Sequence, residues 1–151
     1  MSTTTELPAI AVVAAEFNDF IVTSLVQGAQ RAWQRHGGDP AALRIERVPG
    51  AFELPLAALT LAQTGRYAAI VALGCVIRGD TAHFDYVAGQ AARGLMDAGL
   101  RSGVPVIFGV LTTDNVEQAL ERAALSRGDK GGEAMETALA MARWLGNVRG
   151  R

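Results

Sequence analysis

The sequence predicts a single-domain α/β protein, a three-layer α/β/α sandwich whose middle layer is a four-stranded parallel sheet. Continuous apolar runs at 9–15, 68–77 and 104–111 are typical of strands covered on both faces. Stretches with helical spacing of apolar residues alternate with these runs, which favours a parallel sheet with helices on both sides. The chain of 151 residues suits one domain, predicted to span 1–151 with residues 1–8 as a flexible arm.

The first half of the chain predicts two strands, each followed by a helix. Apolar residues recur at helical spacing from Asp19 up to the glycine pair 37–38, which favours a helix stop. Residues 43–48 alternate in character, as expected for a short strand. The next helix should begin near 52–54, because Pro55 is tolerated only in a first turn.

The second half predicts two more strands and three helices. A long helix is expected from about 84 to 102, with Met96 among its apolar positions. Asp114 lies three residues before Glu117, a capping-box pattern for a further helix. That helix should extend to the loop 127–132, and the last helix should follow this loop.

Composition and charge exclude several classes of protein. Fourteen basic and fifteen acidic residues give a net charge of −1, and no basic block indicates nucleic-acid binding. The longest uncharged runs have 12 residues, whereas a membrane-spanning helix needs about 20 apolar ones. The start MSTTTELP lacks the regions of a signal peptide, and a single cysteine suits a reducing compartment, so we expect a cytoplasmic protein. The hydrophobic share of 50% indicates subunit contacts.

The stretch GCVIRGDTAHFDYV (74–87) places polar residues where a buried strand ends and a helix begins. In α/β folds the ligand crevice lies at the carboxyl ends of the strands. We therefore expect the segments 16–18, 49–53 and 108–115 to reach the same rim. Residues 79–81 offer backbone N–H groups and a hydroxyl at a helix start, which suits a phosphate, although an ordinary capped turn is the commoner use of such a sequence.

Several single residues could take part in chemistry, and each has an ordinary structural alternative. His83 could transfer protons near neutral pH or be satisfied by local hydrogen bonds. Phe17 could stack on a planar ligand or belong to the core. Glu53 could accept hydrogen bonds from a ligand or favour the helix dipole, and Arg122 could bind a phosphate or lie solvated. Cys75 lies inside an apolar strand and favours a small buried residue over a nucleophile.

No pattern indicates a nucleotide, metal or adhesion site. The chain has neither GxxxxGK[ST] nor GxGxxG. His36 and His83 are isolated, and with one cysteine they form no metal-ligand cluster, so we expect no metal. Residues 78–80 spell the adhesion tripeptide RGD, but they end a buried strand in a chain without features of export.

Three longer motifs occur in order along the chain: VPGAFELP (48–55), VIRGDTAHF (76–84) and FGVLTTDNVEQALERA (108–123). Together they resemble the lumazine synthase family of riboflavin biosynthesis, and the resemblance covers nearly the whole chain. It implies a flavodoxin-like fold and the condensation of 5-amino-6-(D-ribitylamino)uracil with 3,4-dihydroxy-2-butanone 4-phosphate. The implied products are 6,7-dimethyl-8-ribityllumazine, phosphate and water, formed without a metal or organic cofactor.

The resemblance also implies roles for residues at the pyrimidine site. His83 matches the residue that transfers protons, and Phe17 matches the aromatic that stacks on the pyrimidine. The other matches line the ring and ribityl chain or contact the pyrimidine edge through their backbone: Ala51, Phe52, Glu53, Cys75, Val76 and Ile77.

A second group of matches concerns the phosphate and the neighbouring subunit. Asp80 and Thr81 match the turn that holds the phosphate, with the Asp80 side chain expected to point away from it. Arg122 matches a phosphate-binding arginine and Phe108 a ring-site contact, both supplied by a neighbouring subunit in the family. Lys130 matches a nearby basic position.

The resemblance further implies a homo-oligomer. The family forms pentamers, some of which build icosahedral shells of twelve pentamers, and riboflavin synthase is a candidate partner. The loop length at 126–131 resembles that of shell-forming members. Two alternatives to an enzyme are a catalytically weak relative that binds flavin or lumazine and a mainly structural shell protein. Only Glu16 and Asp80, where the chain departs from common family residues, support the first.

Overall fold

A computed structural model describes residues 6–150, so residues 1–5 and 151, and with them most of the predicted arm, lie outside the described residues. One parallel sheet has the strand order β2-β1-β3-β4. The strands are β1 (Ile10–Ala15), β2 (Arg44–Val48), β3 (Ala69–Ile77) and β4 (Val106–Thr113). The predicted four-stranded parallel sheet is thus confirmed.

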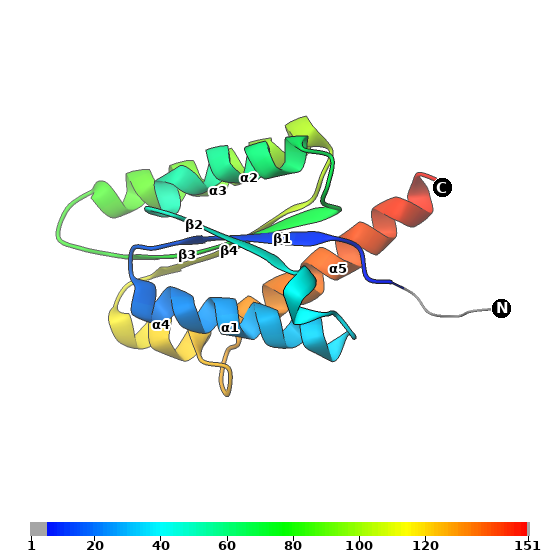
Figure 1. Cartoon of the computed structure of the whole chain (residues 1–151). Coiled ribbons are helices and arrows are strands. Elements are labelled where there is room, and N and C mark those ends of the chain that lie inside the picture. Colours follow the sequence, from blue (N-terminus) through cyan, green and yellow to red (C-terminus); the bar gives the residue numbers. More distant parts are fainter. Residues whose placement is uncertain (1–5, 151) are drawn as a thin grey trace.

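Helices cover both faces of this sheet (Figure 1). One layer contains α2 (Leu54–Gln63) and α3 (His83–Ser102). The other contains α1 (Asp19–Arg35), α4 (Val116–Ala123) and α5 (Lys130–Val148). Short 3-10 turns occur at Pro40–Ala42 and Ala51–Glu53. These layers confirm the predicted α/β/α sandwich. Within the described residues, no helix is both long and apolar enough to cross a membrane.

Side chains of β1 alternate between two cores, one on each face of the sheet. Ile10, Val12 and Ala14 pack toward α1 and α5, and their cluster also includes Leu7 near the start of the described chain. Ala11 and Val13 pack toward α2 and α3. Each fully buried Val or Ile side chain stabilises the fold by about 1.5–3 kcal/mol relative to an exposed one. Burial on both faces therefore explains why β1 is a continuous apolar run.

The loop 127–132 proved shorter than predicted, because α5 begins at Lys130. Asp129 adopts a left-handed conformation (φ 45°), and its carboxylate accepts a hydrogen bond from the Gly132 N–H at 3.2 Å. Gly131 lies so close to the Leu25 carbonyl that a Cβ atom there would collide with it. Because Gly131 has no side chain, the start of α5 can pack directly against α1.

The expected capping box begins one residue later than predicted. The Asn115 side chain, rather than that of Asp114, accepts from the Gln118 N–H at 2.8 Å. Gln118 Oε1 in turn accepts from the Asp114 N–H, also at 2.8 Å. The helix ends at Ala123, short of the expected loop, because Ala124 is already extended.

Two expectations of burial were wrong. Met96, expected on the apolar face of its helix, is 66% exposed. β4 is not covered on both faces along its length, since Val106 and Ile107 are half-buried and Phe108 is 45% exposed. The strand lies at the edge of the sheet and pairs only with β3. An apolar run can therefore belong to an edge strand that the rest of the chain covers only in part.

Candidate active site

A cavity of about 820 Å³ lies at the carboxyl ends of β1 and β3; we call it the first cavity. Pairing between β1 and β3 stops at Ala14 and Leu73, whereas pairing between β3 and β4 continues to Ile77 and Thr113. β3 thus extends past β1 by several residues. Residues 75–77 line the first cavity, and backbone groups of this overhang that β1 does not pair can bond a ligand.

Asn18 closes the end of β1 against this overhang. It adopts a left-handed conformation (φ 60°), which asparagine tolerates better than most residues. Its Nδ2 donates to the Cys75 carbonyl at 2.8 Å. This hydrogen bond fixes the end of β1 against β3, and Asn18 itself lines the first cavity.

Aromatic rings form much of the first cavity's wall. Phe17, Phe52 and Tyr86 are 71%, 58% and 70% exposed, and Phe84 lies buried beside them. Large exposed aromatics cost solvation free energy unless something covers them, and their faces suit planar ligands. This wall is therefore ready to bind a flat ring.

Two ionisable side chains in the first cavity have no partner within the described residues. The imidazole of His83 is exposed and makes no hydrogen bond, although its backbone N–H donates to Thr81 Oγ1 at 3.3 Å. The carboxylate of Glu53 is exposed and forms no hydrogen bond or ion pair. Both groups are free to bond a ligand.

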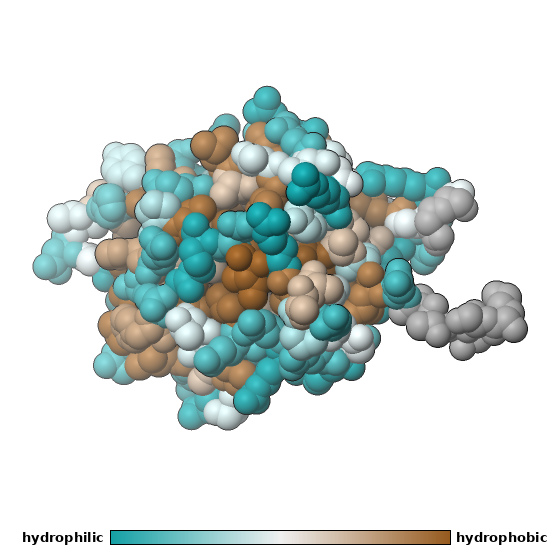
Figure 2. Space-filling model, in the orientation of Figure 1, coloured by the Kyte–Doolittle hydropathy of each residue, from teal (hydrophilic) through white to brown (hydrophobic). Residues whose placement is uncertain are grey.

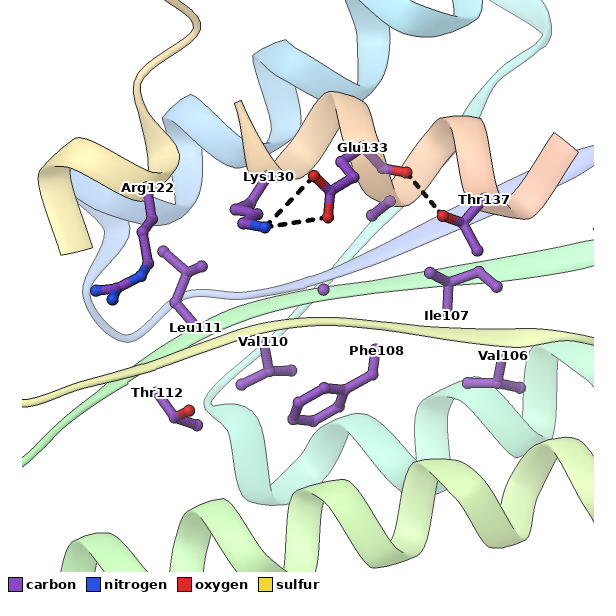
Figure 3. Close-up of a pocket in the computed structure, with 12 residues that line it drawn as sticks. Val106, Ile107, Phe108, Val110, Leu111, Thr112, Arg122, Lys130, Glu133 and Thr137 are labelled. Carbon is purple, nitrogen blue, oxygen red and sulfur yellow. Dashed lines mark hydrogen bonds and ion pairs between the residues drawn. The ribbon is translucent and has the colours of Figure 1, made fainter. Parts of the chain in front are cut away.

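A second cavity, of about 490 Å³, runs along the free edge of β4. Figure 3 shows that Phe108 projects from one side of β4, whereas Arg122 from α4 and Lys130 from α5 lie on the other. Lys130 Nζ is 3.1 Å from Glu133 Oε1, which partly neutralises it. Arg122 is exposed and has no hydrogen-bond or ion-pair partner among residues 6–150, so its charge is available.

The segment 108–115 divides: residues 108–112 line the second cavity, whereas Thr113 and Asp114 contact Arg78 at the carboxyl end of β3. Residues of segments 16–18 and 49–53 line the first cavity, together with the end of β3. Residues 106–112 line the second cavity instead, because β4 presents the length of its free edge there. The imidazole and the unpaired guanidinium accordingly lie in different cavities of one chain.

Comparison with known proteins identifies the family of this chain. The family described as 6,7-dimethyl-8-ribityllumazine synthase matches residues 8–145. A protein of that name from Nitratidesulfovibrio vulgaris strain DP4 is 56% identical over 133 residues, covering 88% of this chain and 85% of the relative. One from Deinococcus radiodurans is 51% identical over 138 residues, covering 91% and 89%. The chain belongs to the lumazine synthase family.

The residues matched to lumazine synthases divide between the two cavities. Those in the first cavity share the carboxyl ends of β1 and β3 and the start of α3: Phe17, Ala51, Phe52, Glu53, Cys75, Val76, Ile77, Thr81 and His83. Phe108, Arg122 and Lys130 line the second cavity. Asp80 is exposed and lines neither cavity, while its neighbours Gly79 and Thr81 line the first.

Sequence analysis missed two prominent residues of the lumazine synthase cavity. Asn18 could have been found as a residue prone to left-handed backbone directly after a buried strand. Tyr86 lies three residues after His83, a spacing that places both on one face of α3. Residues of the second cavity such as Glu133 and Thr137 gave no such indication, because their neighbour β4 was expected to be buried.

The Cys75 thiol is poorly suited to act as a nucleophile. Burial raises its pKa from 9.0 to about 11, so the thiol stays protonated at neutral pH. It is 3% exposed, which confirms the expected small buried residue. Any contribution of this position to the cavity therefore comes from its backbone.

Proposed function

We propose that this chain condenses 5-amino-6-(D-ribitylamino)uracil with 3,4-dihydroxy-2-butanone 4-phosphate to give 6,7-dimethyl-8-ribityllumazine, phosphate and water. Membership of the lumazine synthase family over residues 8–145 carries the proposal. The first cavity supports it independently, since it combines exposed aromatics with an unpaired imidazole and an unpaired carboxylate. The enzyme is a transferase of riboflavin biosynthesis. The reaction needs no resident metal or organic cofactor.

Recognition of the pyrimidine falls to the strand ends. Phe17 stacks on the ring, and backbone groups of residues 75–77 that Asn18 leaves unpaired bond its amide-like edge. Ala51 and Phe52 line the ring and ribityl chain, and Glu53 accepts hydrogen bonds from them. Backbone groups have a fixed donor and acceptor pattern, so they select the heterocycle without depending on side-chain identity.

His83 moves the protons that the condensation requires. The substrate amine adds to the ketone and a first water leaves to form an imine, phosphate is then eliminated, and attack of the second amine on the remaining carbonyl closes the ring with loss of a second water. An imidazole with a pKa near neutrality can accept and return protons in successive steps. His83 reaches into the first cavity with its ring free of protein partners.

The phosphate is bound by groups from both cavities. The turn that includes Asp80 and Thr81 supplies N–H groups and a hydroxyl from the first, and Thr81 lines it. Arg122 supplies a fork of donors suited to phosphate, with Lys130 as a further charge. Since these cations lie in the second cavity of the same chain, the complete site needs the second cavity of a neighbouring subunit, which also contributes Phe108.

A homo-oligomer follows from this shared site. Exposed apolar side chains support it, among them Leu56, Met96, Leu100, Phe108 and Trp144. Figure 2 shows hydrophobic residues on the face in view, between the two helical layers and among hydrophilic ones. We propose a pentamer, with an icosahedral shell of twelve pentamers as the larger assembly, riboflavin synthase as a further partner, and a cytoplasmic location.

The direct test mixes the purified protein with both substrates near neutral pH. Lumazine absorbance and released phosphate are followed against a protein-free control, because an amine and a ketone also react without help. Equal amounts of both products, formed well above the control rate, are expected. A folded oligomer that gives only the spontaneous rate would overturn the proposal in favour of a flavin-binding or structural shell relative.

A further inference from the structure

Arg78, the arginine of the RGD tripeptide, lies at a junction of three segments beside the first cavity. Its backbone N–H donates to the Thr113 carbonyl at 2.8 Å, which extends the pairing of β3 with β4 by one residue. From this fixed backbone position the Arg78 side chain extends toward the surface, where it is half-exposed. Its direction is therefore set by what it contacts.

The guanidinium makes three contacts at once. Nε lies 3.1 Å from Asp114 Oδ1, in the connection between β4 and α4. Nη1 lies 3.6 Å from Asp85 Oδ1, in the first turn of α3. The guanidinium carbon lies 4.4 Å from the centroid of the Phe84 ring, within the range of a cation–π contact. A planar group with five donors can satisfy all three together, which an ammonium cannot.

The turn at residues 79–81, between these contacts, forms few hydrogen bonds with the rest of residues 6–150. None of the backbone N–H groups of residues 79–81 donates to an acceptor within residues 6–150. The hydrogen bonds that touch this turn go to Thr81 Oγ1 and the Ala82 carbonyl, both from the start of α3. Arg78 before the turn and Phe84 after it are in direct contact, so their stacking closes the turn at its base.

His83 lies immediately before Phe84, and Thr81 lies within the turn. We propose that Arg78 is a positioning residue: its simultaneous contacts with Phe84, Asp85 and Asp114 fix the start of α3 against the β4–α4 connection and so hold His83 and Thr81 in place. The inference rests on the proposed function for its effect on turnover. Exposed ion pairs contribute little to stability one by one, so Arg78 acts on geometry more than on the overall fold.

The experiment compares Arg78→Met, Arg78→Lys and Asp114→Asn with the wild-type chain. Arg101→Met is the matched control, because Arg101 also lies 3.5 Å from an aspartate (Asp97), on α3 but near its other end. For each protein, kcat and the KM of both substrates are measured, together with amide hydrogen exchange over residues 78–86 and the thermal midpoint.

Arg78→Met should lower kcat by about tenfold, because small misplacements of reacting groups cost that much or more. KM for the pyrimidine substrate should change little, and exchange should accelerate only within residues 78–86. Arg78→Lys keeps the positive charge but loses the planar guanidinium with its several donors, so its kcat should stay several-fold below wild type. Asp114→Asn should lower kcat less than Arg78→Met does. Arg101→Met should match the wild type in every measurement.

Wild-type kcat in Arg78→Met would overturn the inference, as would full activity in Arg78→Lys, which would show that charge alone matters. A fall in kcat with unchanged exchange over 78–86 would also contradict it. If Arg78→Met does not fold, slower turnover and faster local exchange in Asp114→Asn decide the matter. If the wild-type chain has no activity, the proposed function fails, whereas the exchange measurement still tests whether Arg78 holds the turn.

Discussion

The two cavities of this chain differ in the chemistry that they can supply. The first has four aromatic side chains, an imidazole and a carboxylate without partners, and no cationic side chain among its lining residues. The second has an unpaired guanidinium and a lysine, but no histidine. Neither can both transfer protons and neutralise a phosphate. Under the proposed function, each cavity is half of a site that another copy of the chain completes.

Their positions in the sheet explain the difference. The first cavity forms where β1 stops and β3 continues, so loops and helix starts converge there. The second forms along β4, which has a free edge in the sheet and is only partly covered by the rest of the chain. Substitutions in the first cavity should therefore act mainly on turnover, and those in the second mainly on binding of the phosphorylated substrate.

The largest effect is expected for His83→Ala. Loss of the proton-transferring imidazole should lower kcat by about 100-fold or more, with residual turnover because positioning of the substrates remains. Steady-state kinetics on the purified variant measure this, and His36→Ala is the control that removes the other histidine, at the end of α1. A correctly folded His83→Ala protein with wild-type kcat, or with no detectable turnover at all, would contradict the assignment.

A smaller effect on a different parameter is expected for Arg122→Ala. Removal of the guanidinium should raise KM for the phosphorylated substrate by about tenfold or more, since charge-assisted bonds to phosphate are among the stronger polar contacts. KM for the pyrimidine substrate should change far less. Arg127→Ala is a suitable control, because Arg127 pairs with Glu121 close to the same helix. Unchanged saturation by the phosphorylated substrate would place Arg122 outside the site.

The smallest effect concerns Cys75, behind the wall of the first cavity. Because its pKa is raised to about 11, the native thiol should resist alkylation at pH 8 and react only after unfolding. The raised pKa also means that burial of the neutral thiol stabilises the fold below about pH 9, and that this contribution is lost as the pH rises through 11. Mass spectrometry after timed alkylation measures the reactivity. Rapid labelling of the native protein would show an accessible thiolate.

Patterns of apolar residues predicted the layers of the fold well. β1 and β3 are buried on both faces, and burial of this kind produces a continuous apolar run in the sequence. The same rule held only in part for β4, where Val110 and Leu111 are buried but Val106 and Ile107 are half-buried and Phe108 is exposed. A hydrophobic run does not distinguish burial within a chain from burial between chains. Met96 on α3 was misplaced because an apolar residue at a helical spacing can lie at the exposed margin of a helix.

The proposed site could be predicted in part from residues, whereas its assignment as a whole rests on the resemblance. His83, Phe17 and Glu53 follow strand ends, so topology alone placed them near a crevice. Nothing local separated Arg122 from an ordinary helix arginine, and its free charge became visible only once its lack of partners was known. Asn18 and Arg78 act through contacts with residues distant in sequence, Cys75 and Asp114, which no local pattern contains.

The central claim is that each active site combines the first cavity of one subunit with the second cavity of another. It is tested most directly by mixing His83→Ala and Arg122→Ala chains in equal amounts, unfolding and refolding them together, and assaying turnover with the phosphorylated substrate well below its wild-type KM, where both variants alone are slow. Random assembly restores one complete site for about a quarter of the neighbouring pairs, so activity should reach about a quarter of the wild-type value. Activity no higher than the mean of the two separately refolded variants would contradict a shared site.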